Sequence, residues 1–271
     1  MSTMNRFENT FTRLRAGNRK ALIPFFTAGD PALEATVPVM HALVEAGADA
    51  IELGVAFSDP MADGPVIQRS SERALERGAG TGYVFDCVRR FRQRDADTPV
   101  VLMGYLNPVE IHGAARYAAE AVAAGVDGVL LVDLPPEEAA SFQDAFDAAG
   151  LALVMLASPT TTDERAAMLC AKAQGYLYYV SYAGVTGADH LDAGVAGQRL
   201  AQLRAAARVP VVAGFGIKDA ASAAAMAVDA DGVVVGSALV AAMAGAESPD
   251  QAAACASTFL APLRQALDAS A

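Results

Sequence analysis

The sequence has little of what nucleic-acid-binding and membrane proteins need. Its 20 Lys and Arg residues stand against 31 Asp and Glu residues, which gives a formal net charge of −11. Binding to nucleic acid or to anionic lipid depends on basic residues, so this charge argues against both partners. No apolar run approaches the roughly 20 residues that span a bilayer. With 54% hydrophobic residues among 271, we expect a globular protein rather than a disordered one.

Disulfide partners and soft metal ligands are also scarce. The 3 cysteines, Cys87, Cys170 and Cys255, form no Cys-x-x-Cys pair, and the 3 histidines lie far apart along the chain. This pattern argues against a disulfide framework and against a zinc site. We therefore expect a protein of a reducing compartment, the cytoplasm, with no metal and no cofactor.

The first 20 residues have a mixed signature. They contain five basic side chains against one acid, Glu8, a composition that transit peptides share. However, Phe7, Phe11 and Leu14 fall at i, i+4 and i+7, the spacing of a helix that packs on a core. We predict a structural helix over residues 1–17 in preference to a targeting segment.

Eight short apolar runs alternate with Ala-rich segments of helical spacing in the rest of the chain. We predict strands over 21–26, 49–54, 98–103, 127–132, 151–156, 175–181, 209–213 and 231–235. We predict helices over 31–46, 65–95, 109–124, 136–149, 162–173, 195–207, 218–229 and 237–268. The strands lack strict alternation, as expected when both faces of a parallel sheet are covered. A junction with Gly or Asp recurs, for example AGADAIEL at 46–53 and AGVDGVLL at 124–131, and indicates repeated βα units.

Eight βα units in about 250 residues are typical of a (β/α)8 TIM barrel. We expect a single domain over 1–271, with the N-terminal helix at 1–17 and the barrel at 18–268. A doubly wound open sheet is the alternative, but it usually has fewer strands, and no G-x-G-x-x-G follows the first strand here. Pro38 lies within the first helical segment of the barrel and predicts a kink or a delayed start there.

Two carboxylates occupy positions where a TIM barrel has its active site, at the ends of the strands. Glu52 interrupts the apolar second strand, and a buried carboxylate must be paired, protonated or used. An outward Glu52 paired with a helix cation is the alternative, because alternation alone does not decide its direction. Asp63 ends the long loop that follows, where capping the next helix is a sufficient alternative role. Two carboxylates at one pocket mouth favour separate acid/base and orienting roles.

The last three strands add further candidates. Tyr176 and Tyr178 share one face of the sixth strand and Tyr179 the other, with core packing as the alternative role. The small-residue stretch that follows, to about Gly194, could be a lid. Residues 214–217 and 236–238 follow the last two strands, where TIM barrels usually bind phosphate through main-chain amides; tight turns are the alternative. These residues indicate a cofactor-free enzyme that holds a phosphorylated small molecule and uses a carboxylate as acid/base.

Several motifs together resemble the tryptophan synthase α subunit family. The most specific is E-L-G-V-A-F-S-D-P-M-A-D-G-P at 52–65. The others are P-F-F-T-A-G-D-P at 24–31, L-M-G-Y-L-N-P at 102–108, D-L-P-P-E-E at 133–138, V-S-Y-A-G-V-T-G at 180–187, G-F-G-I at 214–217 and G-S-A at 236–238. The resemblance covers nearly the whole chain. It implies a lyase of tryptophan biosynthesis that cleaves indole-3-glycerol phosphate to indole and glyceraldehyde 3-phosphate.

The resemblance also implies roles for individual residues. It implies that Glu52 is the catalytic acid/base, that Asp63 binds the indole N–H and that Tyr178 assists. Other positions that match the family's substrate contacts are Gly187, Gly216, Gly236 and Ser237 at the phosphate, Phe25, Tyr105 and Phe215 around the indole, and Thr186, the lid residue that pairs with Asp63 on closure.

The resemblance implies a partner as well, a PLP-dependent β subunit that receives indole through a tunnel in an α2β2 complex. Ala56 stands where the family usually has proline, and Tyr182 where it commonly has arginine. We expect unchanged site chemistry with altered coupling to β. A free-standing indole-3-glycerol phosphate lyase is an alternative, as is a mainly regulatory subunit of a PLP enzyme, against which the intact carboxylates argue. Other phosphate-binding barrels would need a Lys or paired Asp at the strand ends, which we do not find.

Overall fold

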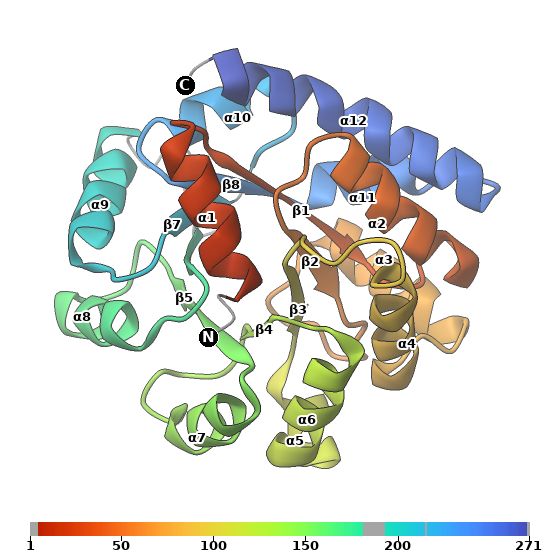
Figure 1. The fold of residues 1–271 in the computed structure, drawn as a ribbon, viewed down its shortest axis with the longest axis horizontal. Coiled ribbons are helices and arrows are strands. Elements are labelled where there is room, and N and C mark those ends of the chain that lie inside the picture. Colours follow the sequence, from red (N-terminus) through yellow and green to blue (C-terminus); the bar gives the residue numbers. More distant parts are fainter. Residues whose placement is uncertain (1–4, 181–192, 215, 270–271) are drawn as a thin grey trace.

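Eight parallel strands close into a barrel in the computed structural model, which describes residues 5–180, 193–214 and 216–269 (Figure 1). The strands are Ala21–Thr27 (β1), Ile51–Gly54 (β2), Val100–Gly104 (β3), Gly128–Leu131 (β4), Ala152–Ala157 (β5), Leu177–Val180 (β6), Val211–Gly214 (β7) and Gly232–Val235 (β8). Each strand pairs with its sequence neighbours, and β8 pairs with β1. The predicted TIM barrel with an extra N-terminal helix is confirmed.

Helices form the outer layer of the barrel. They are α1 (Arg6–Ala16), α2 (Thr36–Glu45), α3 (Pro65–Glu76), α4 (Thr81–Phe91), α5 (Leu106–His112), α6 (Ala114–Ala124), α7 (Ala140–Ala149), α8 (Asp163–Lys172), α9 (Ala193–Ala206), α10 (Ala220–Ala227), α11 (Ser237–Met243) and α12 (Pro249–Ala269), with the 3-10 turn η1 (Leu33–Ala35) before α2. Because they cover the outer face of the sheet, the strands are almost entirely buried and read as continuous apolar runs.

Three segments that were each predicted as one helix form two helices in the structure. The segments 65–95, 109–124 and 237–268 divide into α3 and α4, α5 and α6, and α11 and α12. Gly78 and Gly113 mark the first two breaks, with φ angles of 85° and 87° in the left-handed region that ends a helix. Helical spacing continues across such a break, so periodicity alone did not reveal it. The delayed start predicted from Pro38 is confirmed, since α2 begins at Thr36 and places Pro38 in its first turn, where no N–H is required.

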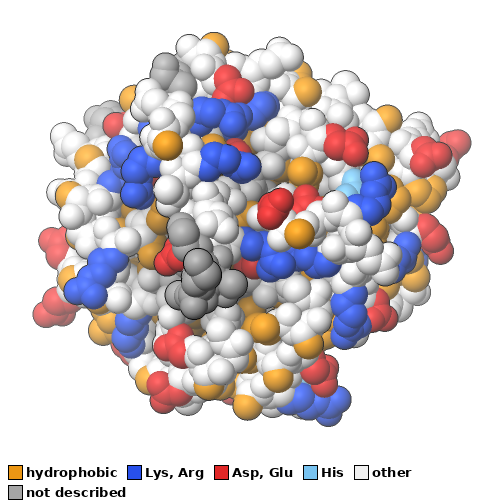
Figure 2. Space-filling view, in the orientation of Figure 1, with side chains coloured by type: hydrophobic (Ala, Val, Ile, Leu, Met, Phe, Trp, Pro, Cys, Tyr) orange, Lys and Arg blue, Asp and Glu red, His pale blue; other side chains and the backbone are white. Residues whose placement is uncertain are grey.

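Helix α1 lies across the end of the barrel at which the strands begin (Figure 1). Phe7, Phe11 and Leu14 are buried, as the spacing predicted. The rings of Phe7 and Phe11 contact Tyr176, with centroids 5.9 Å and 6.3 Å away. Charged side chains of both signs are scattered over this face of the molecule (Figure 2). Helix α1 therefore packs directly on a tyrosine that enters the barrel interior.

Four side chains join the strands in pairs at the same end. The backbone N–H of Asp49, just before β2, donates to the Leu22 carbonyl at 2.9 Å, and Asp49 Oδ2 accepts the Leu22 N–H at 3.0 Å. The same two-bond clamp joins Asp127 to Val100, Gln174 to Leu153 and Asp231 to Val211. Each clamp residue precedes an even-numbered strand and binds the preceding odd-numbered one. Strands 2, 4 and 8 were therefore predicted to start too early, because their clamp Asp was assigned to the strand.

Arginines complete three of these clamps. Arg264 of α12 lies 3.0 Å from Asp49, and Arg204 of α9 lies 2.9 Å from Asp231. Asp127 forms ion pairs with two arginines, Arg92 at 2.7 Å and Arg6 of α1 at 2.8 Å. The charged groups thus fasten the outer helices to this end of the barrel, and the opposite end is left for the site.

Candidate active site

Glu52 points into the barrel and is 0% exposed. Strand pairing places it beside Phe25 of β1 and Val101 of β3. The Tyr176 hydroxyl donates to Oε1 at 2.5 Å, and Oε2 has no hydrogen-bond partner among the described residues. Burial raises the pKa of Glu52 to about 7, although the bond from Tyr176 lowers it. The inward direction is settled, and the carboxyl group can both hold and release a proton near neutral pH.

Tyr176 contacts Glu52 directly, and the sequence argument did not select it as a site residue. It lies just before β6, is completely buried, and reaches Glu52 from the end closed by α1. Burial and the Glu52 carboxylate raise its pKa well above the usual value, so the hydroxyl stays protonated and remains a donor. The available signal was the shared strand face of Tyr176 and Tyr178, which did not show which hydroxyl meets the carboxylate.

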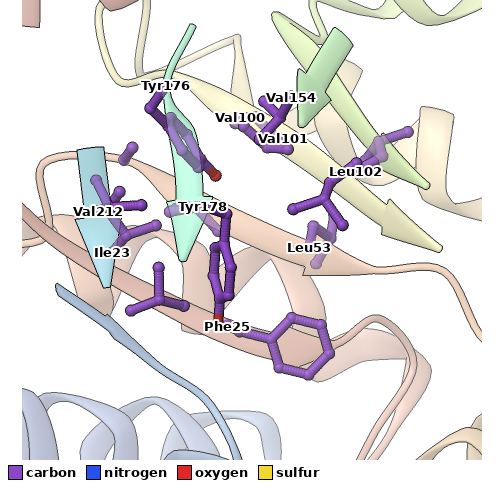
Figure 3. Packing of buried hydrophobic residues seen from close by; sticks show 14 of the residues in the cluster. Ile23, Phe25, Leu53, Val100, Val101, Leu102, Val154, Tyr176, Tyr178 and Val212 are labelled. Atoms are coloured by element: carbon purple, nitrogen blue, oxygen red, sulfur yellow. The ribbon is translucent and has the colours of Figure 1, made fainter. Parts of the chain in front are cut away.

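Tyr178 lies nearer to the mouth of the barrel than Tyr176, and its ring is directed toward Phe25 (Figure 3). A Cβ at Gly214 of β7 would collide with the Tyr178 hydroxyl, so glycine provides the space that this side chain occupies. Burial raises the pKa of Tyr178, and the Glu52 carboxylate raises it further. The structure thus brings Tyr178 into the same interior as Glu52, and its assisting role stays a prediction.

Asp63 is half-buried in the loop between β2 and α3. Its Oδ2 accepts a hydrogen bond from the Tyr105 hydroxyl at 3.0 Å, and the Tyr105 oxygen accepts the N–H of Ala62, also at 3.0 Å. Burial raises the pKa of Asp63, while the bond from Tyr105 lowers it. The N-cap of α3 is Gly64, without a side-chain cap, which excludes the capping role for Asp63. Tyr105, expected only as an apolar neighbour of the indole, therefore also orients this carboxylate.

Phe25, Asp63 and Tyr105 line one pocket at the mouth of the barrel. The pocket has about 10 Å³ of free volume, room for about one water molecule, so an aromatic ring enters only when its walls move apart. Asp63 is its one charged group among the described residues; the other lining residues are Thr27, Gly54, Val55, Ile67, Ser71, Met103, Gly104 and Val132. An apolar pocket with a single carboxylate suits a flat ring that carries an N–H donor.

The loops after β7 and β8 lie next to each other, because the two strands pair side by side. Gly236 and Ser237 begin α11, whose first turn has no side-chain cap. The first turn of α10 is already capped, since the Asp219 carboxylate accepts the Ser222 N–H at 2.8 Å. Gly216, exposed and with a φ of 71°, completes the pair of loops. Among the described residues, the first turn of α11 therefore offers main-chain N–H groups to an anion, whereas the N–H of Lys218, in the loop after β7, already donates to Ser222 Oγ at 3.1 Å.

Thr186, Gly187, Phe215 and Tyr182 lie outside the described residues. Within the described part of the chain, no group of three or more His, Cys, Asp or Glu residues is arranged to hold a metal ion. No helix among the described residues is long and apolar enough to cross a membrane.

Comparisons with known proteins agree on one family. Residues 11–268 match the family model described as tryptophan synthase alpha chain. The chain belongs to this family. Alpha chains from Xanthomonas euvesicatoria pv. vesicatoria (strain 85-10) and Xylella fastidiosa (strain 9a5c) are each 71% identical over 266 residues, 98% of this chain and 99% of theirs. Like them, this chain carries the family's sequence over nearly its full length.

Solved alpha chains have the same fold. Tryptophan synthase subunit alpha from Legionella pneumophila str. Paris is 45% identical, with a TM-score of 0.91 over 98% of this chain and 100% of that one. The tryptophan synthase structure from M. tuberculosis in its aminoacrylate-bound form is 34% identical, with a TM-score of 0.85 over 97% and 99%. Both sequence and architecture therefore support the family assignment.

Proposed function

We propose that this chain cleaves indole-3-glycerol phosphate to indole and glyceraldehyde 3-phosphate, with Glu52 as the general acid/base. Membership in the alpha chain family makes the protein a carbon–carbon lyase subunit of tryptophan biosynthesis. The observation that carries the assignment of Glu52 is its complete burial in the barrel with one carboxyl oxygen that has no hydrogen-bond partner among the described residues. A buried carboxyl group with a pKa of about 7 is suited to proton transfer at neutral pH.

The cleavage needs one proton to move within the substrate. Protonation of indole C3 creates an indolenine cation and weakens the bond from C3 to the glycerol carbon. As that bond breaks, the electron pair returns to the indole ring, and the adjacent hydroxyl loses its proton to become the aldehyde. Glu52 performs both transfers, giving a proton to C3 and taking one from the hydroxyl, so it ends in the form in which it began.

The remaining candidates bind and orient the substrate. Asp63, held by Tyr105, accepts the indole N–H and stabilises the positive charge that develops on the ring. Tyr178 assists from β6, and Phe25 and Phe215 pack against the ring. The phosphate is bound by main-chain amides at Gly216, Gly236 and Ser237 together with Gly187. Thr186 pairs with Asp63 when the site closes.

Membership in the family implies a β subunit as partner. We further propose that the complex is α2β2, that indole passes to a PLP-dependent β subunit, and that the protein is cytoplasmic. In this proposal residues 1–271 form one domain, with the helix at 1–17 and the barrel at 18–268. A free-standing lyase is the alternative and would use the same carboxylates.

Indole release from the pure chain tests the proposal. The protein is incubated with indole-3-glycerol phosphate, with and without a β subunit. The released indole is extracted into an organic solvent, which leaves the phosphorylated substrate in water, and is measured by its fluorescence. The chain has 0 Trp and 7 Tyr residues, so indole emission stands out from that of the protein. We expect indole from the chain alone and a faster reaction with β. No indole in either mixture contradicts the activity, whereas equal rates in both favour the free-standing lyase.

A further inference from the structure

A basic pocket of about 260 Å³ lies at the end of the barrel opposite the active site. It is formed where α1 ends, β1 begins and α9 approaches the barrel. Its lining residues are Phe11, Leu14, Arg15, Asn18, Arg19, Lys20, Arg204, Pro210 and Asp231. Figure 2 shows Lys and Arg side chains gathered over this part of the surface, in the upper left of the view.

The charges in this pocket do not balance. Four cations and one carboxylate line it, in a chain whose net charge is −11. Arg19 pairs with Asp268 at 2.9 Å, and Arg204 pairs with Asp231 at 2.9 Å. Arg15 and Lys20 form no ion pair with any residue of the described chain. Two positive charges are thus left without a carboxylate of their own.

Of the two, Lys20 has the less favourable environment for a positive charge. It is half-buried, and its ammonium group donates to the Ala230 carbonyl at 2.7 Å, which leaves other N–H donors toward the pocket. Burial lowers the pKa of Lys20, and the charge of Arg204 lowers it further, against the opposing effect of Asp231 and Asp229. An anion in the pocket would therefore favour the charged form of Lys20.

A purely structural role accounts for only part of this cluster. Arg15 lies in the last turn of α1, where a cation interacts favourably with the helix dipole, and Arg19 ties the following loop to α12. Arg204 fastens α9 to the clamp residue Asp231. None of these roles explains why Lys20, just before β1, directs a further positive charge into the same cavity. Convergence of cations from three elements is the arrangement expected of an anion site.

We propose that this pocket binds the phosphate group of a small anionic metabolite, with Arg15 and Lys20 as its principal contacts. A guanidinium group matches two phosphate oxygens at once, and an ammonium group adds a compact charge. Arg19 and Arg204 contribute to the field while keeping their carboxylate partners. The site is distinct from the catalytic phosphate site, because the barrel separates the starts of the strands from their ends.

Titration calorimetry with inorganic pyrophosphate at low ionic strength tests the proposal on the full chain. We expect two binding events, one at each end of the barrel. In the Arg15→Gln/Lys20→Gln variant one event is lost or weakened by about tenfold or more, because charge-assisted hydrogen bonds are removed. Competitive inhibition of indole release by pyrophosphate, which reports the catalytic phosphate site, is expected to stay unchanged in this variant.

The control variant is Arg89→Gln/Arg116→Gln, which removes the same two charges from exposed positions on α4 and α6. It is expected to keep both binding events. Equal loss in the two variants would show an effect of net charge alone and would overturn the proposal. Binding only at high concentration and insensitive to both variants, an adventitious ion only, would overturn it too. Arg15→Gln by itself, at an exposed side chain without an ion pair in the described chain, repeats the test without a folding risk.

Discussion

Burying Glu52 links catalysis to stability at a single residue. In the unfolded chain a glutamate has a pKa near 4.5, but in the barrel burial raises it to about 7. Between these values the folded state binds more protons than the unfolded state, so stability decreases as the pH rises through this window. Above pH 7 Glu52 is ionised in the folded protein, with no cation paired to it among the described residues, and the loss of stability reaches its full size.

Glu52→Gln is therefore expected to stabilise the protein at high pH. The amide is neutral at every pH and still accepts the Tyr176 hydroxyl hydrogen bond. The free energy of unfolding, measured with urea, should exceed that of the unsubstituted chain by up to about 3 kcal/mol at pH 8 and approach it near pH 5. Glu247→Gln, at an exposed site, is the control and should change little. A pH-independent difference would show that Glu52 does not titrate as inferred.

Tyr176→Phe should move the pH dependence of catalysis. The Tyr176 hydroxyl stabilises the ionised form of Glu52, so its removal raises the pKa of that carboxyl group further. The inflection of kcat/KM that Glu52 controls should shift to higher pH, as measured by indole release across pH 5–9. Tyr178→Phe leaves the hydrogen bond between Tyr176 and Glu52 in place, so the inflection of kcat/KM should not show this shift. Identical profiles for the unsubstituted chain and Tyr176→Phe would contradict the role of Tyr176.

Some residues of the site could be predicted from the sequence, and others could not. Glu52 was recognisable because a carboxylate in an apolar strand is costly, and Asp63 because it ends a long loop at the same end of the barrel. Tyr176 was not selected, because strand alternation gives the side on which a hydroxyl lies but not its height in the barrel. The bond from Tyr105 to Asp63 joins two loops, and such a contact depends on their tertiary arrangement.

At the scale of elements, the two ends of the barrel have separate tasks. The clamps and their arginines lie where the strands begin, whereas the candidate site lies where they end. The apolar runs predicted the strands and their alternation with helices. The helix breaks at Gly78 and Gly113 were not predicted, because they depend on backbone conformations that periodicity does not encode. The clamp residues were visible as a recurring Asp, but their long-range partners were not.

Asp127→Ala tests this division. It removes the side-chain bond of the clamp to Val100, keeps the backbone bond, and leaves Arg92, whose side chain is 11% exposed, without that carboxylate. Loss of one partner from a largely buried pair should destabilise the protein by about 3–5 kcal/mol, measured by urea unfolding. The kcat for indole release in native buffer should be unchanged. Asp144→Ala, at an exposed site on α7, should cost no more than about 0.5 kcal/mol. A large loss of kcat without destabilisation in Asp127→Ala would contradict the division.

At the scale of the whole molecule, the loop between β2 and α3 carries both Asp63 and Ala56, the residue at which we expect altered coupling to β. Ala56 in this loop is buried against Ala74 and Ala79. Ala56→Pro restores the residue usual in the family and fixes φ, so it should stiffen the loop. We expect tighter β binding and stronger activation by β, with the kcat of the isolated chain unchanged. Calorimetry with β and the indole assay check both effects.

Ala56→Val is the matched control for that change, because it adds volume at the same buried position without fixing φ. It should not strengthen coupling to β. Unchanged affinity and activation in Ala56→Pro would count against the inference that this residue weakens the coupling.

The most direct test is the kcat of Glu52→Gln for the cleavage of indole-3-glycerol phosphate, measured at pH 7 on the isolated chain. Because the substitution is expected to preserve the fold, lost activity reports chemistry. Removal of the general acid/base should lower kcat at least about 100-fold. A kcat at or near that of the unsubstituted chain would contradict the assignment of proton transfer to this carboxyl group.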